Sequence, residues 1–187
     1  FDVLGNLRLE IARQLDLLKK DDFKFLWVTE FPLLEYSEEE GRFVAMHHPF
    51  TAPMDECLEY LETDKSKVRA KAYDLVLNGT ELSSGSIRIT DYELQQKMFQ
   101  ALGLSDEEIE AKFGFLVEAY KYGAAPHGGM GIGLDRLAML MCGAPSLRDV
   151  VAFPKVQNAS EIMSGCPAPF EEKALAELGL EIKNNEQ

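Results

Sequence analysis

The chain has 187 residues, of which 46% are hydrophobic and 27% are charged, a composition that suits one well-cored globular domain. Its formal net charge of −13 argues against a general nucleic-acid-binding face, although net charge does not exclude a local pocket lined by arginine. No apolar run approaches the ~18 residues of a membrane-spanning helix, so no membrane partner is expected.

The first expected element is an amphipathic helix over residues 7–18. Its apolar positions recur at helical spacing and form one stripe: Leu7, Ile11, Leu15 and Leu18. The charged run at 19–22 then marks a boundary. Because the sequence starts without methionine and is already in helical periodicity, we expect it to be a piece of a longer protein.

A β-hairpin is expected over residues 24–51. Its first strand, FKFLWVTEFPLLEY, is aromatic and branched, with Pro32 at an edge or bulge, and the turn SEEEG leads to the second strand, RFVAMHHPFT. Neighbouring side chains of a strand point to opposite faces. At most one of His47 and His48 would therefore line a given pocket, and a purely structural role for both is the alternative.

Residues 52–70 are polar and irregular, with room for a short helix. A second hairpin follows in AYDLVLNGTELSSGSIRI, because Asn78-Gly79 is a strong signal for a two-residue turn. Such a turn would place Val76 opposite Glu81 across the two strands.

Period-two alternation then places Asp74 on the face of Glu81. Two carboxylates on one face suit oxygen ligation of Mg²⁺ beside phosphates, and the alternative is two solvated acids on an exposed face. Arg88 has the opposite parity and reaches this face only if SSGS contains a bulge, for which Gly85 is well suited. In a pocket, an arginine is a natural bidentate partner for a carboxylate; in a regular hairpin, Arg88 would lie on the surface.

Helices are expected in four segments of the second half of the chain: 91–102, 106–121, 134–142 and 171–178. Ser105 and Glu108 form a capping box at the start of the second of these helices. The segment SLRDVVAFPK adds a helical turn and a strand. Hairpins with helices between them, rather than alternating βαβ units, favour an α+β fold with an antiparallel sheet flanked by helices.

The glycine-rich segment GAAPHGGMGIG precedes the third of these helices. Its spacing matches neither the dinucleotide nor the P-loop fingerprint. Glycines at alternate positions suit a strand that a flat ligand approaches closely, and Arg136 in the following helix could stack on a ring or pair with a phosphate. A glycine-relieved contact between strand and helix is the alternative. His127, before the glycines, is open to the same structural interpretation as the other histidines.

The cysteines are odd in number and none has a C-x-x-C spacing: Cys57, Cys142 and Cys166. Neither a disulfide framework nor a zinc site is indicated. This usage fits a reducing compartment, so a cytoplasmic location is expected.

Together, several segments resemble bacterial-type aspartyl-tRNA synthetases, which are class II synthetases. The resemblance covers nearly the whole chain, in order and approximate spacing: FLWVTEFPLLEY, AMHHPFTAP, YDLVLNGTELSSGSIRI, KFGFLVEAYKYGAAPHGGMGIGLDRLAMLMCG and SLRDVVAFPK. GLDR resembles the end of the third class II motif, and HHPFT with SSGSIR narrows class II to the aspartate enzyme. The chain has two serines in SSGS where glycines are common in the family.

The resemblance implies that ATP activates L-aspartate and that the aspartyl group then passes to the 3′ end of tRNA, with Mg²⁺ as cofactor. It implies an ATP site of five residues: Glu81, Gly133, Leu134, Asp135 and Arg136. Glu81 and Arg136 would act in catalysis, and Asp74 would share Mg²⁺ with Glu81. Arg88 would bind the side-chain carboxylate of L-aspartate, and His47 would close over the bound amino acid.

The resemblance further implies tRNA-Asp, or both tRNA-Asp and tRNA-Asn, as partner, and a homodimer for the full-length protein. Residues 1–20 would be the end of an inserted domain, and 21–187 the C-terminal part of the class II catalytic domain. Because the first and second class II motifs are missing, the chain alone is not expected to form aspartyl-adenylate. Two alternatives are an asparagine-synthetase-type enzyme that activates aspartate without tRNA, and a non-catalytic nucleotide-binding scaffold.

Overall fold

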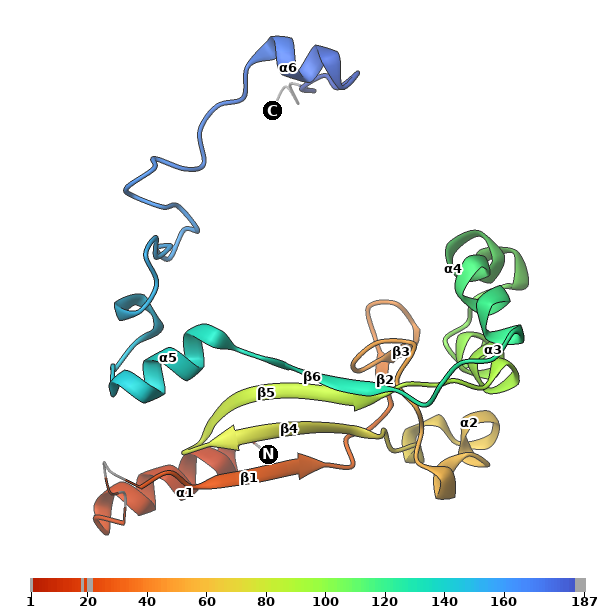
Figure 1. Cartoon of the computed structure of the whole chain (residues 1–187), viewed down its shortest axis with the longest axis horizontal. Helices are drawn as coiled ribbons and strands as arrows, with labels where there is room; N and C mark the ends of the chain where they lie inside the picture. Colours follow the sequence, from red (N-terminus) through yellow and green to blue (C-terminus); the bar gives the residue numbers. More distant parts are fainter. Residues whose placement is uncertain (1, 18, 20–21, 184–187) are drawn as a thin grey trace. The chain divides into compact units, whose positions relative to one another are not determined.

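The structure is a computed structural model that describes residues 2–17, 19 and 22–183 (Figure 1). The chain divides into two compact units, Phe1–Gly133 and Leu134–Gln187. Across the described ranges, no helix has both the length and the apolar character that crossing a membrane requires.

A four-stranded antiparallel sheet forms the centre of the first unit. Its strands occur in the order β1 (Phe25–Thr29), β4 (Ala72–Leu77), β5 (Thr80–Ile87) and β6 (Gly128–Ile132). All neighbouring strands are antiparallel. The predicted α+β class with an antiparallel sheet is therefore confirmed.

The hairpin of β4 and β5 turns at Asn78 and Gly79, as predicted. Both residues have positive φ angles, 49° and 82°, as a two-residue turn of type I′ requires. The turn places Val76 opposite Glu81, so the predicted register is also confirmed next to the turn.

One step further from the turn, β5 contains a bulge. Leu75 pairs with Ser83 and not with Leu82, so Leu82 is an extra residue in β5. The bulge predicted at Gly85 is therefore wrong in position. Gly85 sits in regular register, and its missing side chain serves close packing, since a Cβ there would lie 2.7 Å from Cε2 of Tyr73.

The predicted hairpin over residues 24–51 is only partly right. Its turn does join two strands, β2 (Leu34–Ser37) and β3 (Arg42–Ala45), which form a separate two-stranded sheet. The first half of the expected strand is instead β1, which pairs with β4. The chain leaves the sheet between them because Glu30 has a φ of 60° and Pro32 has no N–H to donate to a ladder.

The first helix, α1 (Asp2–Gln14), begins earlier and ends earlier than predicted. Leu7 and Ile11 lie on it and are exposed, whereas Leu15 follows its end. Leu18 lies outside the described residues. The predicted boundary near residue 20 falls partly on residues that the structure does not describe and stays a prediction.

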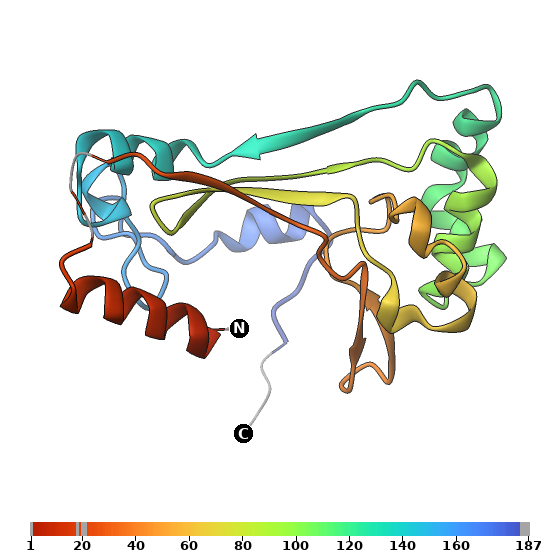
Figure 2. The same cartoon turned by 90° about the horizontal axis from the view of Figure 1, so that it is seen from below.

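Short helices and two longer ones complete the first unit. The irregular segment predicted at 52–70 contains three short helices, η1 (Asp55–Cys57), α2 (Tyr60–Thr63) and η2 (Lys65–Lys67). The longer helices are α3 (Tyr92–Ala101) and α4 (Asp106–Lys121). Figure 2 shows α2, α3 and α4 at one end of the sheet and α1 at the other end, near the turn between β4 and β5.

Apolar packing and capping explain the position of α3 and α4. The predicted capping box is present, because Ser105 accepts from Glu108 N–H and the Glu108 carboxylate accepts from Ser105 N–H. Phe99 of α3 is fully buried and stacks on Phe113 of α4 with ring centroids 4.8 Å apart. Phe50 packs edge-on against both rings. Through this aromatic cluster, α3 and α4 pack against the segment that carries His47 and His48.

The second unit contains α5 (Leu134–Cys142), the short helix η3 (Leu147–Asp149) and α6 (Glu172–Glu177), which confirms the helices predicted there. The strand predicted in SLRDVVAFPK does not form. Lys155 makes only an isolated bridge to Glu161, so this segment has no continuous ladder.

Candidate active site

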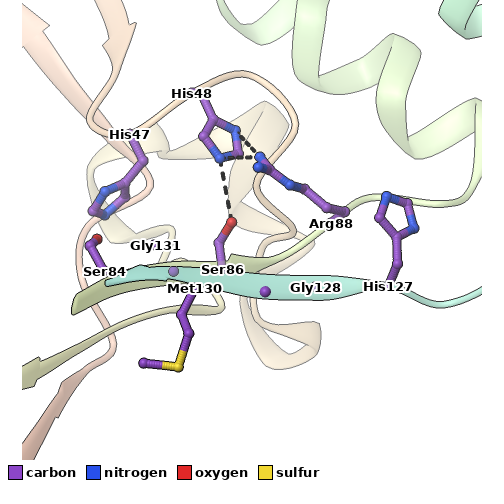
Figure 3. A pocket seen from close by; sticks show the side chains of 11 residues that line it. His47, His48, Ser84, Ser86, Arg88, His127, Gly128, Met130 and Gly131 are labelled. Carbon is purple, nitrogen blue, oxygen red and sulfur yellow. Dashed lines mark hydrogen bonds between the residues drawn. The ribbon is translucent and has the colours of Figure 1, made fainter. Parts of the chain in front are cut away.

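A pocket lies on one face of the sheet, at the end of β5 that is remote from the turn (Figure 3). Polar side chains of six residues line it: His47, His48, Ser84, Ser86, Arg88 and His127. The segment 128–131 of β6 adds mainly backbone to the lining. In Figure 3, the Met130 side chain points away from the histidines, to the other side of the sheet.

The bulge in β5 decides which side chains face this pocket. Asp74 pairs with Ser84, and Val76 pairs with Glu81. Since cross-strand partners share a face, Glu81 and Ser84 lie on the same face although their separation in sequence is odd. Arg88 continues the alternation from Ser84. The predicted shared face of Asp74 and Glu81 is thus confirmed, and Arg88 reaches this face through a bulge at Leu82 and not through the bulge considered in SSGS.

Arg88 and His48 are in direct contact. Nη1 of Arg88 lies 2.7 Å from Nδ1 of His48 and also contacts Nε2 (Figure 3). Backbone N–H of Phe50 donates to Nδ1 at 3.3 Å. Hydroxyl groups of Thr51 and Ser86 lie 3.4 Å from Nε2. His48 is therefore at the centre of a small polar network that forms part of the pocket lining.

The surroundings of His48 disfavour its protonation. Burial, and then the positive charge of Arg88 and the neighbouring His47, lower the pKa of His48 below its ordinary value of 6.5. A neutral imidazole can accept the hydrogen bond that Arg88 offers.

His47 lines the same pocket, so the expectation that the two histidines point to different sites is wrong. The reason is local: β3 ends at Ala45, and His47 lies in a bend where strand alternation no longer applies. The His47 ring packs edge-on against Phe31, with centroids 5.4 Å apart. His47 and Arg88, both predicted to bind L-aspartate, are thus brought to one pocket.

His127 precedes β6 and connects it to the end of β5. Its carbonyl oxygen accepts a hydrogen bond from the backbone N–H of Arg88 at 3.0 Å. Its Nδ1 lies 2.9 Å from the Ala125 carbonyl oxygen, which can only accept, so Nδ1 carries a proton. The remaining ring nitrogen, Nε2, is left to other partners.

Two glycines of β6 lie on the pocket face, because Gly129 pairs with Ser86 and Gly131 pairs with Ser84. A Cβ added at either glycine would meet no described atom within 4 Å. In contrast, a Cβ at Gly128, on the opposite face, would lie 2.8 Å from Cδ1 of Ile87. Packing within the described residues therefore requires glycine at 128 but not at 129 or 131.

The carboxylates predicted to hold Mg²⁺ lie on the pocket face but outside the pocket lining. Oδ1 of Asp74 is buried and has no hydrogen-bond partner among the described residues. A buried carboxylate oxygen without a partner is costly unless a cation or donor meets it. Asp74, with Glu81 on the same face, therefore fits one side of a magnesium site in which phosphate oxygens and water supply the other ligands. Across the described part of the chain, no three acidic, histidine or cysteine side chains gather into a complete metal site.

The residues predicted to bind ATP are divided between the two units. Gly133 ends the first unit, where its N–H donates to the Leu82 carbonyl at 2.9 Å. Leu134, Asp135 and Arg136 form the first turn of α5 in the second unit. Their contribution to an ATP site stays a prediction.

Three lining or supporting residues were missed: Ser84, Ser86 and Thr51. The signal for the serines was present, because small polar residues alternate with period two up to Arg88 in SSGSIR. Thr51 is fully buried and forms an isolated bridge with Arg88. No local pattern marks it as a neighbour of the pocket.

Comparison with known proteins shows the family of the chain. The family described as tRNA synthetases class II (D, K and N) matches residues 6–157. An aspartate–tRNA ligase of Ruminiclostridium cellulolyticum is 64% identical over 182 residues, which are 97% of this chain and 31% of that ligase. An aspartate–tRNA(Asp/Asn) ligase of Lachnoclostridium phytofermentans is 62% identical over 97% of this chain and 30% of its own length.

Among solved structures, an aspartyl-tRNA synthetase from Entamoeba histolytica superposes with a TM-score of 0.54 at 26% identity, covering 82% of this chain and 26% of that one. The chain thus spans about a third of the length of the curated relatives that it matches. On the family match over most of its residues, the chain belongs to the class II tRNA synthetases of the aspartate, lysine and asparagine group.

Proposed function

We propose that these residues are part of the catalytic domain of an aspartate–tRNA ligase, which activates L-aspartate with ATP and transfers the aspartyl group to the 3′ end of tRNA. The observation that carries the proposal is the position of Arg88 in a pocket beside the open glycine positions of β6. The identity of 64% to a protein named aspartate–tRNA ligase supports the choice of amino acid.

Arg88 gives the pocket its preference for a carboxylate. A guanidinium presents a planar fork of N–H donors, which matches two carboxylate oxygens and would meet a donor on the amide of asparagine. No carboxylate belongs to the described lining, so the positive charge of Arg88 has no neutralising acid there. His47, from the bend above the sheet, would cover the bound L-aspartate.

Gly129 and Gly131 offer space for the flat part of ATP against the backbone of β6. Glu81, Gly133, Leu134, Asp135 and Arg136 would complete the ATP site, with Arg136 on the base and phosphates. In the reaction, an α-carboxylate oxygen of L-aspartate bonds to the α-phosphorus while the bond to pyrophosphate breaks. This step needs no protein nucleophile, so the residues contribute positioning and neutralisation of charge.

Asp74 and Glu81 would hold Mg²⁺, which would neutralise phosphate charge when bound. The unpartnered Oδ1 of Asp74 supports this assignment. The 3′-terminal adenosine of tRNA then accepts the aspartyl group from the adenylate. We place the full-length enzyme in the cytoplasm, as a homodimer.

A second tRNA is a further candidate substrate, because one relative at 62% identity is named aspartate–tRNA(Asp/Asn) ligase. Aminoacylation of separate tRNA-Asp and tRNA-Asn transcripts by the full-length enzyme decides between the two specificities.

Aspartate-dependent exchange of pyrophosphate into ATP tests the central proposal. We expect exchange with L-aspartate by the full-length protein, and none by these 187 residues alone, because the chain matches only about 31% of the relatives' length. Exchange that depends on asparagine or lysine and not on aspartate would contradict the proposal. A full-length protein that makes aspartyl-adenylate but charges no tRNA would instead support the asparagine-synthetase type.

A further inference from the structure

We propose that His48 is a positioning residue for Arg88: as a neutral hydrogen-bond acceptor it fixes one arm of the guanidinium, so that the other arm is directed to the substrate carboxylate. The orientation of Arg88 follows from its contacts with the ring of His48. Only the identity of its ligand rests on the proposed function.

The tautomer of His48 follows from its neighbours. The backbone N–H of Phe50 and the Nη1 group of Arg88 both approach Nδ1, at 3.3 and 2.7 Å. Because Nη1 also contacts Nε2, Arg88 by itself does not distinguish the two ring nitrogens. The Phe50 N–H can only donate and approaches Nδ1 alone, so it makes Nδ1 the unprotonated acceptor. The proton of the neutral ring is then on Nε2, where the hydroxyl of Ser86 can accept it.

Protonation of His48 would break this arrangement. A second proton would place an N–H at Nδ1, against two donors, and would add a cation beside Arg88. The other titratable or charged groups of the pocket lining are His47 and His127, and neither is an acid. Nothing in the described lining would therefore compensate a positive charge on His48, in agreement with its lowered pKa.

The backbone holds His48 in place for this role. Nε2 of Gln95, a fully buried residue of α3, donates to the carbonyl oxygen of Pro49 at 2.9 Å. Phe50 is packed into the aromatic cluster of α3 and α4. The residues directly after His48 are thus anchored, and the ring is restrained by Thr51 and Ser86.

A fixed Arg88 side chain should raise the affinity for L-aspartate and the discrimination against asparagine. A long side chain that is already ordered loses less conformational freedom when the ligand binds. With Nη1 held by His48, the remaining N–H groups form a fork of defined direction, which a carboxylate satisfies and an amide does not. We therefore expect His48 to act on the KM for L-aspartate and on selectivity against asparagine, and to leave the KM for ATP nearly unchanged.

The test compares His48→Ala with His48→Asn in the full-length ligase that contains these residues. Asn keeps an oxygen acceptor close to the position of Nδ1, can still accept from Phe50 N–H, and cannot be protonated near neutral pH. We expect H48A to raise the KM for L-aspartate about 10- to 100-fold, the range for a hydrogen bond to a charged group, and to lower selectivity against asparagine. We expect H48N to stay within about threefold of the wild type.

The pH dependence adds a readout that a merely structural role would not move. For the wild type, the KM for L-aspartate should rise as the pH falls through the lowered pKa of His48 and the ring becomes protonated. The H48N protein should lack the part of this rise that belongs to His48.

An H48A protein with the wild-type KM for L-aspartate, or an H48N protein as impaired as H48A, would overturn the inference and leave the proposed function intact. Identical pH profiles of the wild type and H48N would also overturn it. If H48A fails to fold, H48N and the pH profile still decide. Absence of aspartate-dependent exchange in the wild-type enzyme would overturn the proposed function, and the role of His48 in aspartate binding with it.

Discussion

Glu81 and Arg88 lie on the same face of the four-stranded sheet, although their odd separation along the chain would place them on opposite faces of a regular strand. Leu82, the extra residue of β5, compensates for this odd separation. One strand therefore presents a carboxylate near the turn and a guanidinium at its far end to the same side. The proposed magnesium and aspartate sites can thus share one face.

Replacement of Arg88 by lysine should impair binding of L-aspartate while the charge is kept. Lysine has no planar fork and cannot hold His48 and a carboxylate in the geometry described above. We expect the KM for L-aspartate in pyrophosphate exchange to rise about 10- to 100-fold, with little change in the KM for ATP. Arg69→Lys is the matched control, since Arg69 is exposed and lies outside the pocket lining. Equal KM values for the two variants would contradict the role of Arg88.

Substitution of Gly131 by alanine should weaken ATP binding without loss of stability. A Cβ at this position meets no described atom within 4 Å, so the folded protein tolerates it, whereas a ligand against the strand would be displaced. We expect the KM for ATP to rise several-fold or more, because overpacking against the ligand costs about 1–3 kcal/mol of binding free energy. The melting temperature should not change.

Gly128→Ala is the control for this variant, because its Cβ would lie 2.9 Å from the Ser86 carbonyl oxygen and 2.8 Å from Ile87. We expect it to lower the free energy of unfolding by about 1–3 kcal/mol. A Gly131→Ala protein that melts early but binds ATP normally would show that glycine serves packing at both positions.

Asp74→Asn should shift the Mg²⁺ dependence of the reaction. The buried Oδ1 has no partner among the described residues, and an amide is a poorer Mg²⁺ ligand than a carboxylate. We expect the Mg²⁺ concentration for half-maximal exchange to rise roughly tenfold or more, since even supporting residues of metal sites have effects of that size.

Without Mg²⁺, the melting temperature of the Asp74→Asn protein should not fall, because a buried charge without a partner is unfavourable. Asp55→Asn serves as a control: Asp55 is an exposed acid paired with Lys71 at 2.7 Å, so it should leave the Mg²⁺ dependence unchanged. An unaltered Mg²⁺ dependence in Asp74→Asn would remove this residue from the metal site.

The stability of the chain should depend on pH through His48. Because its pKa is lowered below 6.5 in the folded state, the unfolded chain binds a proton more readily in the range between the lowered value and 6.5. The contribution of His48 to the free energy of unfolding is therefore fully present at pH values above 6.5. It is lost as the pH falls through the lowered pKa. Denaturant unfolding across this pH range should show that the free energy of unfolding falls more steeply with decreasing pH for the wild type than for His48→Asn. Parallel curves would contradict the prediction.

Local signals were sufficient for the elements whose geometry is set within a few residues. The Asn78-Gly79 turn fixed the pairing next to it, because a two-residue loop leaves little freedom in register. Ser105 and Glu108 likewise specified the start of α4 through their reciprocal hydrogen bonds.

Features that depend on distant partners could not be predicted in this way. The partner of β1 is β4, which lies far along the chain. The break before β2 depends on the left-handed conformation of Glu30, which no neighbouring residue predicts. The bulge was expected at a glycine, yet Gly85 is needed for close approach of β6, and Leu82 is the residue left unpaired. His47 and His48 share a pocket because β3 stops before them, an end that the sequence pattern does not mark.

The bulge also has a consequence for hydrogen exchange. If Leu82 were absent, Glu81 and Arg88 would have an even separation and would share a face in a regular strand, so the extra residue is not the only route to that arrangement. Without Leu82, however, the chain would lose the carbonyl oxygen that accepts a hydrogen bond from the Gly133 N–H at 2.9 Å. The deuterium uptake of the Gly133 amide therefore reports how firmly the last residue before α5 is held by β5.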